Sequence, residues 1–396
     1  MAKKTIKDLT DLKGQRLLIR VDFNVPLEAD GAIANDRRIR AALPTIQYGL
    51  ERGASAVVMS HLGRPKGDPA KDAPFKMDRV AARLKELLGT PVHKVDQVVG
   101  DKATAAAAAL KPGEVLVLEN LRFHPGEQAG DPAFAQQLGS LGSVYVNDAF
   151  GTCHRKDASM VAVPAEMKGK PRVVGLLVSK ELDVLNQLLN NPKKPMIGVL
   201  GGAKVSDKIG FIKAMLQRVD RLLIGGAMAY TFMAALGKPT GKSRVEKDKV
   251  DVARQLLDLA KTKITLPVDF VVVDKPDATA KTQIVEAGIP DGLEGLDIGP
   301  KTRSQYADEI AKAATVVWNG PVGKFEDEPF SHGTKAIAKA MADSKAVTVV
   351  GGGETAEAVE EFGLDSKMTH VSTGGGAFLE YIAGTPFPAL AEIDDK

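Results

Sequence analysis

Nine short apolar runs, separated by helical patterns, restrict the possible fold of this 396-residue chain most strongly. The runs are apolar almost throughout rather than alternating, which is typical of parallel strands covered by helices on both faces. Amphipathic helical patterns fill the intervals, for example at 77–88 and 250–259. This alternation of strand and helix predicts an α/β fold. The predicted strands are residues 17–21, 56–59, 115–118, 144–146, 197–200, 222–224, 270–273, 315–318 and 347–350.

The residues that follow these runs divide the chain into two parts. Runs in the first half lead into arginine and histidine, whereas runs in the second half lead into glycine. The change comes between Arg155 and Met196, and a helical pattern at 180–189, ended by Asn191 and Pro192, connects the two parts. A length of 396 residues also favours two domains, since a domain usually has roughly 100–200 residues. We therefore predict two domains of different chemistry, joined by an interdomain helix and hinge.

Composition excludes several classes of protein. With 44% hydrophobic and 26% charged residues the chain can bury large cores, which excludes wholesale disorder. A net charge of +3 is too balanced for a dedicated nucleic-acid or membrane-surface protein. No apolar run approaches the roughly 18 residues that span a bilayer, and no secretory signal is expected. The single cysteine, Cys153, cannot form an internal disulfide, so we expect a soluble cytoplasmic protein.

Basic side chains gather where the first-half strands end. In open parallel sheets, ligands bind beyond the carboxyl ends of the strands. Five basic groups converging there would repel one another unless an anion neutralised them, and arginine suits phosphate and carboxylate ligands. A single arginine more often pairs with a neighbouring carboxylate, but a set repeated at four strand ends favours a small, highly anionic ligand. The residues are Arg38, His61, Arg64, Arg122 and Arg155.

Glycines follow the strands of the second half. They would let backbone amides approach phosphate oxygens at helix N-termini, although close packing of helix on sheet explains any single glycine pair equally well. Repetition at six junctions favours a nucleotide. Lys204 and Lys208, just after Gly202, are predicted to share a helix face that suits a phosphate chain, and a solvated basic face is the alternative. The six histidines form no pair at metal-binding helical spacing, so no built-in metal is expected.

Several longer motifs occur in order from about Arg16 to the C-terminus: Arg-Val-Asp-Phe-Asn-Val-Pro at 20–26, Trp-Asn-Gly-Pro-Val-Gly-Lys-Phe-Glu at 318–326, and segments 60–65, 119–123, 148–155, 201–208 and 372–378. These motifs make the chain similar to the phosphoglycerate kinase family. The resemblance implies reversible phosphoryl transfer between ATP and 3-phosphoglycerate, giving ADP and 1,3-bisphosphoglycerate, with Mg²⁺ accompanying the nucleotide. It also implies two Rossmann-like domains with parallel sheets covered by helices: a substrate domain at 1–179 and a nucleotide domain at 180–383. The tail 384–396 is expected to return to the first domain.

The resemblance also assigns site residues, position by position. The implied ligands of phosphoglycerate are Asp22, Phe23, Asn24, Arg38, His61, Leu62, Gly63, Arg64, Arg122 and Arg155. The implied nucleotide residues are Lys204, Gly299, Glu326, Gly352, Gly353, Glu354 and Thr355, with Mg²⁺ near Glu354. The implied catalytic groups are Arg38, Lys204, Lys208 and the backbone amides near Gly375 and Gly376. The chain departs from the family pattern at Glu354, where aspartate is usual, and at Ala227, where a third glycine is common.

The implied acceptor is a carboxylate that is already ionised at neutral pH, so no general base is needed. Catalysis then consists of positioning two substrates and neutralising charge in an in-line transfer, with closure of the two domains. A phosphohistidine route through His61 is the rival mechanism. A binder of anionic metabolites or nucleotides without catalytic activity is the rival function. We expect a monomer that acts on small molecules, without nucleic-acid or membrane partners.

Overall fold

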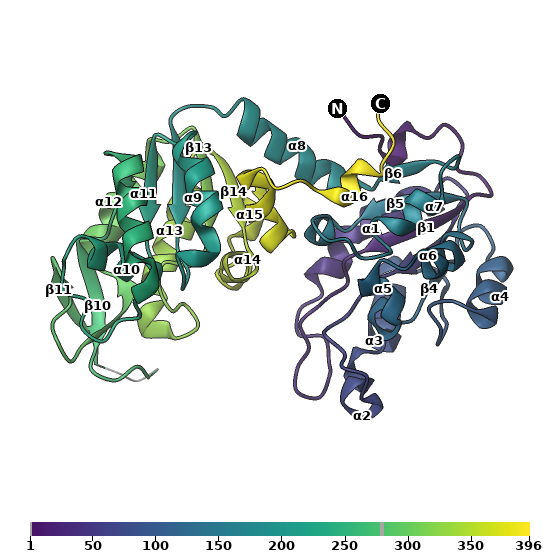
Figure 1. The fold of residues 1–396 in the computed structure, drawn as a ribbon, viewed down its shortest axis with the longest axis horizontal. Coiled ribbons are helices and arrows are strands. Elements are labelled where there is room, and N and C mark those ends of the chain that lie inside the picture. Colours follow the sequence, from purple (N-terminus) through teal and green to yellow (C-terminus); the bar gives the residue numbers. More distant parts are fainter. Residues whose placement is uncertain (1, 278–280) are drawn as a thin grey trace. The chain divides into compact units, whose positions relative to one another are not determined.

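The computed structural model describes residues 2–277 and 281–396, which fold into two compact units (Figure 1). Unit 1 contains the chain through Asp183 together with Pro386–Lys396. Unit 2 contains Val184–Thr385. The assignment of the phosphoglycerate to one unit and the nucleotide to the other stays a prediction.

A six-stranded parallel sheet forms the centre of unit 1. Its strand order is β3-β4-β2-β1-β5-β6, and every described pairing in it is parallel, as predicted for the apolar runs of the first half. The short strands β3 and β6 at its edges were not predicted. The bounds are β1 Arg16–Val21, β2 Ser55–Met59, β3 Val92–Lys94, β4 Val115–Val117, β5 Val144–Asp148 and β6 Arg172–Val174.

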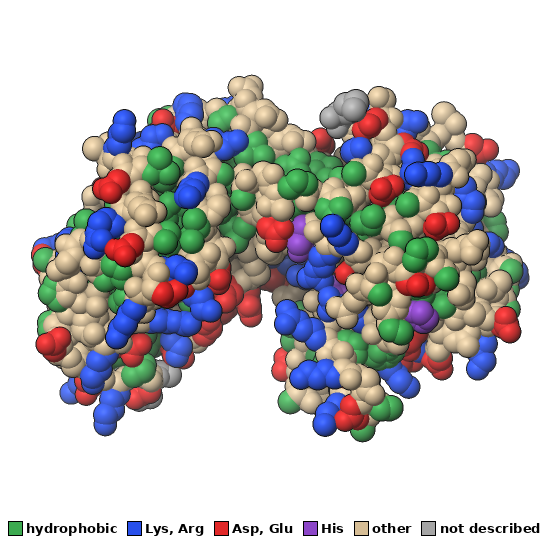
Figure 2. All heavy atoms as spheres, in the orientation of Figure 1, with side chains coloured by type: hydrophobic (Ala, Val, Ile, Leu, Met, Phe, Trp, Pro, Cys, Tyr) green, Lys and Arg blue, Asp and Glu red, His purple; other side chains and the backbone are tan. Residues whose placement is uncertain are grey.

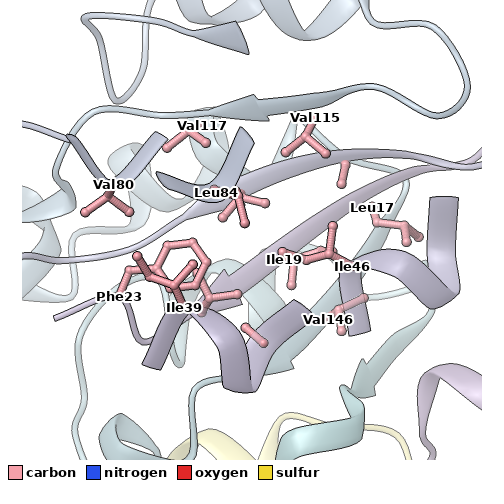
Figure 3. Close-up of a cluster of buried hydrophobic side chains, with 14 of the residues drawn as sticks. Leu17, Ile19, Phe23, Ile39, Ile46, Val80, Leu84, Val115, Val117 and Val146 are labelled. Carbon is pink, nitrogen blue, oxygen red and sulfur yellow. The ribbon is translucent and has the colours of Figure 1, made fainter. Parts of the chain in front are cut away.

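The core of unit 1 lies between this sheet and its helices. Leu17 and Ile19 of β1 belong to a buried cluster that also contains Ile39 of α1 and Leu84 of α3 (Figure 3). Phe23, which follows β1, lies in the same cluster and is fully buried. The α-helices wholly in unit 1 are α1 Arg37–Leu50, α2 Pro69–Asp72, α3 Asp78–Leu88, α4 Asp101–Ala109, α5 Pro125–Ala129, α6 Pro132–Gly139, α7 Ala162–Glu166 and α16 Pro388–Ala391. The 3-10 turns are η1 Ile6–Asp8, η2 Ala73–Phe75, η3 Leu121–Phe123 and η4 Phe150–Thr152.

Unit 2 is built around a second six-stranded parallel sheet, ordered β15-β14-β13-β7-β8-β9. Trp318 of β13 is fully buried in the cluster on this sheet. The strands are β7 Met196–Leu200, β8 Arg221–Ile224, β9 Ile264–Thr265, β13 Thr315–Asn319, β14 Val347–Gly351 and β15 His370–Val371. The α-helices are α9 Ile209–Leu216, α10 Met228–Ala235, α11 Val250–Ala260, α12 Pro300–Ala311, α13 His332–Asp343, α14 Gly353–Glu361 and α15 Gly376–Ala383. The 3-10 turns are η5 Ser206–Lys208, η6 Lys247–Lys249, η7 Glu328–Phe330 and η8 Asp365–Lys367.

The predicted parallel strand at 270–273 was wrong in its pairing. It forms part of β10 Asp269–Val273, the central strand of a separate three-stranded sheet, between β11 Gln283–Glu286 and β12 Glu294–Ile298. Both pairings are antiparallel. β10 is buried along its whole length, and its sequence is therefore as apolar as that of a buried parallel strand. Burial alone therefore does not fix the direction of a neighbouring strand.

Helix α8, Leu176–Asn190, contains the boundary between the two units and includes the predicted interdomain helix at 180–189. Asp148, at the end of β5, holds its first turn, because Oδ1 accepts the N–H groups of Leu177 at 3.0 Å and Val178 at 3.3 Å. The Thr45 hydroxyl of α1 accepts the N–H of Leu176 at 2.8 Å. Burial raises the pKa of the Asp148 carboxyl to about 7, although these hydrogen-bond donors act in the opposite direction. The start of α8 is thus fixed to unit 1.

Replacing Asp148 by asparagine should weaken the pH dependence of stability. The pKa of Asp148 in the folded protein, about 7, lies above the unperturbed value of 3.8. The folded state therefore keeps a proton that the unfolded state releases between these values, so the free energy of unfolding falls as pH rises through this range and levels off above it. Urea unfolding should show that the free energy of unfolding falls more between about pH 5 and about pH 8 in the wild-type protein than in Asp148→Asn. Equal losses would contradict the protonation of Asp148.

The C-terminal residues pack on unit 1. Arg172 of β6 pairs with Asp394 at 2.6 Å, Lys3 pairs with Asp395 at 2.9 Å, and the Ala389 N–H donates to the Cys153 carbonyl at 3.3 Å. Figure 2 shows basic and acidic side chains interspersed over the face drawn, in keeping with a net charge of +3. No helix among the described residues is long and apolar enough to cross a membrane.

Candidate functional site

The four strand ends with basic residues are neighbours in the sheet of unit 1. β4, β2, β1 and β5 lie side by side in that order and run parallel, so the segments after them meet at one edge of the sheet. These segments carry almost all the predicted phosphoglycerate ligands, and Arg38 comes from the start of α1. Topology thus brings together residues that are far apart in the sequence.

Asp22 organises the middle of this edge. Its Oδ2 accepts a hydrogen bond from Nη1 of Arg38, and its Oδ1 lies 3.9 Å from Nδ1 of His61. Burial would raise the pKa of the Asp22 carboxyl, but Arg38, His61 and Arg20 together hold it below its usual value. The carboxylate is therefore ionised and fixes the direction of the Arg38 guanidinium.

A second set of contacts fixes the loop after β2. Asn24 accepts the N–H of Gly63 at 2.8 Å, and Arg122 donates to the carbonyl oxygen of Gly63 at 2.6 Å. Gly63 has a φ of +61°, and a side chain there would collide with the ring of Phe75. Glycine is therefore required at this position, and this one residue links Asn24, through its N–H, to Arg122, through its carbonyl. Arg64, the next residue, is exposed.

Two arginine nitrogens at this edge are buried without a hydrogen-bond partner among the residues that the structure describes. They are Nε of Arg122 and Nη1 of Arg155. Burial lowers the pKa of Arg122, and the nearby charge of Arg155 lowers it further. Buried donors without acceptors are costly, and an anion with several oxygens would satisfy both. The arrangement therefore fits the small, highly anionic ligand that the sequence predicts.

The side chains of Phe23 and Leu62 take no direct part in this edge. Both are buried, Phe23 in the core and Leu62 at 1% exposure. The N–H of Leu62 donates to Oδ1 of Asn120 at 3.1 Å. The N–H of Phe23 likewise donates to the Ser60 hydroxyl at 2.8 Å, so the backbone N–H groups of both residues are already used within the protein.

Sequence reasoning assigned no role to Arg20, Ser159 and Glu127, which lie behind the predicted ligands. Nε of Arg20 donates to the Ser159 hydroxyl at 2.9 Å, and this hydroxyl donates to Oε1 of Glu127 at 2.6 Å. Nη2 of Arg20 lies 3.2 Å from Nδ1 of His61. The sequence held one signal, since Arg20 is a charged residue inside an otherwise apolar strand. A buried charge needs polar partners, and Ser159 and His61 supply them here.

The glycines after β7, β8 and β13 are explained by close packing of backbone segments in unit 2. A side chain on Gly201 would collide with the Pro321 carbonyl, and one on Gly226 would come within 2.6 Å of the Gly202 nitrogen. The N–H groups of Gly201, Gly202 and Gly226 all donate to backbone carbonyls. These amides are therefore not available to phosphate oxygens, and packing accounts for glycine at these junctions.

The prediction that Lys204 and Lys208 share a helix face was wrong. Lys204 lies outside any helix, before η5, and Lys208 ends η5, because α9 begins only at Ile209. Lys208 Nζ donates to the Gly201 carbonyl at 2.6 Å and lies 3.4 Å from the Asn319 carbonyl. Burial lowers the pKa of Lys208 to about 8, against the nearby carboxylates of Glu354 and Asp207. An added phosphate would favour its charged form.

The segment after β14 presents the N-terminus of α14. Gly352 has a φ of +97°, and a side chain there would come within 2.8 Å of the Asn319 amide nitrogen. Thr355 is buried and accepts the N–H of Gly320 at 2.7 Å, so its hydroxyl supports the neighbouring loop. Gly353 and Glu354 are exposed in the first turn of the helix, whose N–H groups have no acceptors within the helix. This terminus can receive an anion.

Two predicted nucleotide residues lie on segments that pack together through Asp297. A side chain on Gly323 would collide with the Asp297 carboxylate, which accepts the N–H of Gly333 at 2.7 Å. Glu326 follows Gly323 and is exposed, whereas Gly299 follows Asp297 and is buried. Glycine is needed at Gly299 because a side chain there would collide with the carboxylate of Asp269. The structure therefore brings the Gly299 and Glu326 segments together.

Gly375 and Gly376 begin α15, directly after β15. Gly375 is the N-cap residue with a φ of +53°, and open space surrounds the position of a side chain at both glycines. β15 and β14 are neighbours, so this helix start and that of α14 follow adjacent parallel strands. Ala227 lies at the N-cap of α10 with a φ of −63°, a conformation that needs no glycine.

Comparisons with known proteins agree on one family. The family model described as phosphoglycerate kinase matches residues 6–385. Curated phosphoglycerate kinases from Rhodopirellula baltica and Moorella thermoacetica are 52% and 51% identical, over 100% of this chain and of each relative. The solved phosphoglycerate kinase of Coxiella burnetii has a TM-score of 0.86 at 39% identity and covers 98% of both chains. That of Pyrococcus horikoshii has a TM-score of 0.88 at 34% identity and covers 99% of this chain and 98% of its own.

Curated relatives that share about half of their residues with this chain over its whole length are named phosphoglycerate kinase, and two solved phosphoglycerate kinases have a similar fold over nearly the whole chain. The chain therefore belongs to the phosphoglycerate kinase family of phosphotransferases.

Proposed function

We propose that the protein transfers a phosphoryl group reversibly between ATP and the carboxylate of 3-phosphoglycerate, giving ADP and 1,3-bisphosphoglycerate. Unit 1 would bind the phosphoglycerate and unit 2 the nucleotide. The observation that carries this proposal is a pair of buried arginine nitrogens that have no hydrogen-bond partner in the described part of the chain, Nε of Arg122 and Nη1 of Arg155, beside the Asp22–Arg38 pair. We further propose that the protein is a monomer, and that it acts in the cytoplasm, which its single, buried and free cysteine favours.

The acceptor carboxylate is ionised at neutral pH, so the protein need only position it and neutralise charge. Arg38 is oriented by Asp22 and would face the transferred group. Lys204 and Lys208 would neutralise the nucleotide phosphates, with the N–H groups at the starts of α14 and α15. In-line attack requires the reacting atoms to approach to about 3 Å, so the proposal includes movement of the units when both ligands are bound.

Mg²⁺ bound with a nucleotide usually takes one or two carboxylates and keeps phosphate oxygens and waters as its other ligands. Glu354 fits this requirement, since its exposed carboxylate in the first turn of α14 lies close enough to Lys208 to affect the pKa of that lysine. Among the residues described, no three His, Cys, Asp or Glu side chains are grouped to hold a metal by themselves. Glu354 is therefore the protein ligand that we propose. When bound, the ion would supply positive charge to the phosphate oxygens.

A coupled assay of ADP formation tests the proposal, with 3-phosphoglycerate and Mg-ATP as substrates. ADP formation that depends on both substrates supports it. A protein that binds both ligands without forming ADP would be the non-catalytic binder.

The same assay tests the buried arginine. Arg155→Ala should raise KM for 3-phosphoglycerate by roughly 10- to 100-fold, the value of one or two charge-assisted hydrogen bonds, and leave KM for ATP within about twofold. Arg52→Ala is the matched control, because Arg52 is exposed and stacks on Tyr48 at 3.5 Å. An unchanged KM for 3-phosphoglycerate in Arg155→Ala would remove the main support for the substrate site.

A further inference from the structure

Arg20 is a fully buried cation that the proposed transfer does not use. Its Nε donates to the Ser159 hydroxyl at 2.9 Å, and its Nη1 donates to the carbonyl oxygen of Val21. Ser159 is in turn fixed by Glu127, which accepts its N–H at 2.9 Å and its hydroxyl at 2.6 Å. These contacts leave Nη2 of Arg20 directed at one further partner, His61.

The hydrogen-bonding chemistry of this pair determines where the imidazole proton lies. Nη2 of Arg20 is 3.2 Å from Nδ1 of His61, and a guanidinium group can only donate. Nδ1 must therefore accept, so a neutral ring carries its proton on Nε2. Asp22 would favour a proton on Nδ1, but its Oδ1 is 3.9 Å from that nitrogen, beyond hydrogen-bonding distance.

The charges around His61 also favour the neutral form of its ring. The charged groups that face the ring are Asp22, Arg20, Arg122 and Arg155. Burial lowers the pKa of His61 well below its ordinary value, and the three arginines lower it further, while Asp22 opposes them only in part. The ring is therefore neutral at physiological pH and, through Nε2, is a donor.

We infer that Arg20 is a positioning residue that keeps His61 in the neutral form with its proton on Nε2, so that the ring donates to an anionic ligand. The identity of that ligand as phosphoglycerate rests on the proposed function. The same geometry argues against His61 as a phosphoryl carrier. Arg20 occupies the lone pair of Nδ1, and Nε2 carries the proton, so neither nitrogen is available as a nucleophile.

Nuclear magnetic resonance of protein labelled with ¹⁵N-histidine tests the protonation state directly, without any ligand. Comparison with His61→Gln assigns the signals of His61 among the six histidines. We expect an unprotonated Nδ1 and a protonated Nε2 at neutral pH. A proton on Nδ1, in the neutral ring or in the imidazolium, would overturn the inference. The wild-type spectrum decides this point whether or not any Arg20 variant folds.

A variant that removes the Arg20 charge tests its role in ligand binding. Arg20→Met combined with Glu127→Gln deletes both the cation and the carboxylate behind it, so no buried charge is left unpaired. We expect His61 to take up a proton at higher pH than in the wild-type protein, and KM for 3-phosphoglycerate to rise about tenfold with a smaller change in kcat. Glu127→Gln alone keeps Arg20 and should keep the wild-type protonation of His61.

The outcomes separate the inference from the proposed function. A wild-type protein that forms no ADP from 3-phosphoglycerate, but has the expected spectrum, would contradict the function and keep the protonation assignment. If the double variant changed the His61 spectrum with no change in KM for 3-phosphoglycerate, Arg20 would have no role in recognition. Both results come from two proteins, the wild type and the double variant.

Discussion

Replacing Arg38 by alanine should lower turnover at least about a hundredfold while leaving the fold intact. A charge-stabilising arginine in phosphoryl transfer can contribute roughly 10³–10⁵ in rate, and Lys204 and Lys208 would compensate for part of the loss. The structure supports this role because Arg38, in the first turn of α1, donates to the ionised Asp22 at the centre of the arginine-rich edge. Steady-state kinetics with 3-phosphoglycerate and Mg-ATP measures the loss, and circular dichroism checks folding.

Arg37→Ala is the matched control, because it removes the same type of side chain one position earlier. Adjacent residues on a helix point about 100° apart, so Arg37 and Arg38 cannot face the same ligand. Arg37 is the first residue of α1, and we expect its variant to stay within a few-fold of the wild-type turnover. If Arg37→Ala were the inactive variant and Arg38→Ala the active one, the catalytic arginine would be misplaced by one residue.

The central strands of both parallel sheets could be predicted because they are buried over almost their whole length. β1, β2 and β5 in unit 1, and β7 and β13 in unit 2, are mostly apolar segments bounded by polar or glycine-rich ones. The edge strands could not be predicted, since β3, β6, β9 and β15 have only two or three residues each, too few to show a period. Their strand conformation depends on the neighbours with which they pair.

The antiparallel sheet of unit 2 could not be predicted for a different reason. β11 is mostly exposed, and β12 includes Glu294 and Asp297, so neither segment is an apolar run. β10 resembles a buried parallel strand, and nothing within its own five residues reveals the direction of its partners. The direction of a neighbouring strand depends on residues far away in the sequence, whereas a short segment reveals only its own amino-acid composition.

One part of the candidate site could likewise be predicted from the sequence, and another part could not. Residue types at strand ends predicted the arginine-rich edge, since parallel topology places all such ends together. The Arg20–Ser159–Glu127 contacts could not be predicted, because Ser159 lies 139 positions after Arg20 in the chain. The lysine pair was misread because a spacing of four predicts a shared helix face only if both residues are in the helix, and Lys204 is not.

Lys204→Ala should lower kcat by roughly 10²–10³ while changing KM for 3-phosphoglycerate only slightly, since the lysine would bind the nucleotide phosphates through the transition state. Lys204 is exposed and has no ion pair or hydrogen bond through its ammonium group within the part of the chain that the structure describes. Its replacement should therefore leave the free energy of unfolding almost unchanged. Lys208, by contrast, donates to the Gly201 carbonyl, so its removal would also disturb the loop.

The difference in contacts makes Lys204 the better test of charge neutralisation, because a loss of activity could not be ascribed to a loss of structure. Lys213→Ala is the matched control, since Lys213 is an exposed lysine on the nearby helix α9. We expect wild-type kcat and both KM values in that variant. If Lys204→Ala kept near-normal turnover, the nucleotide phosphates would have to be neutralised by Lys208, Arg38 and the helix N-termini alone, and Lys204 would have no catalytic role.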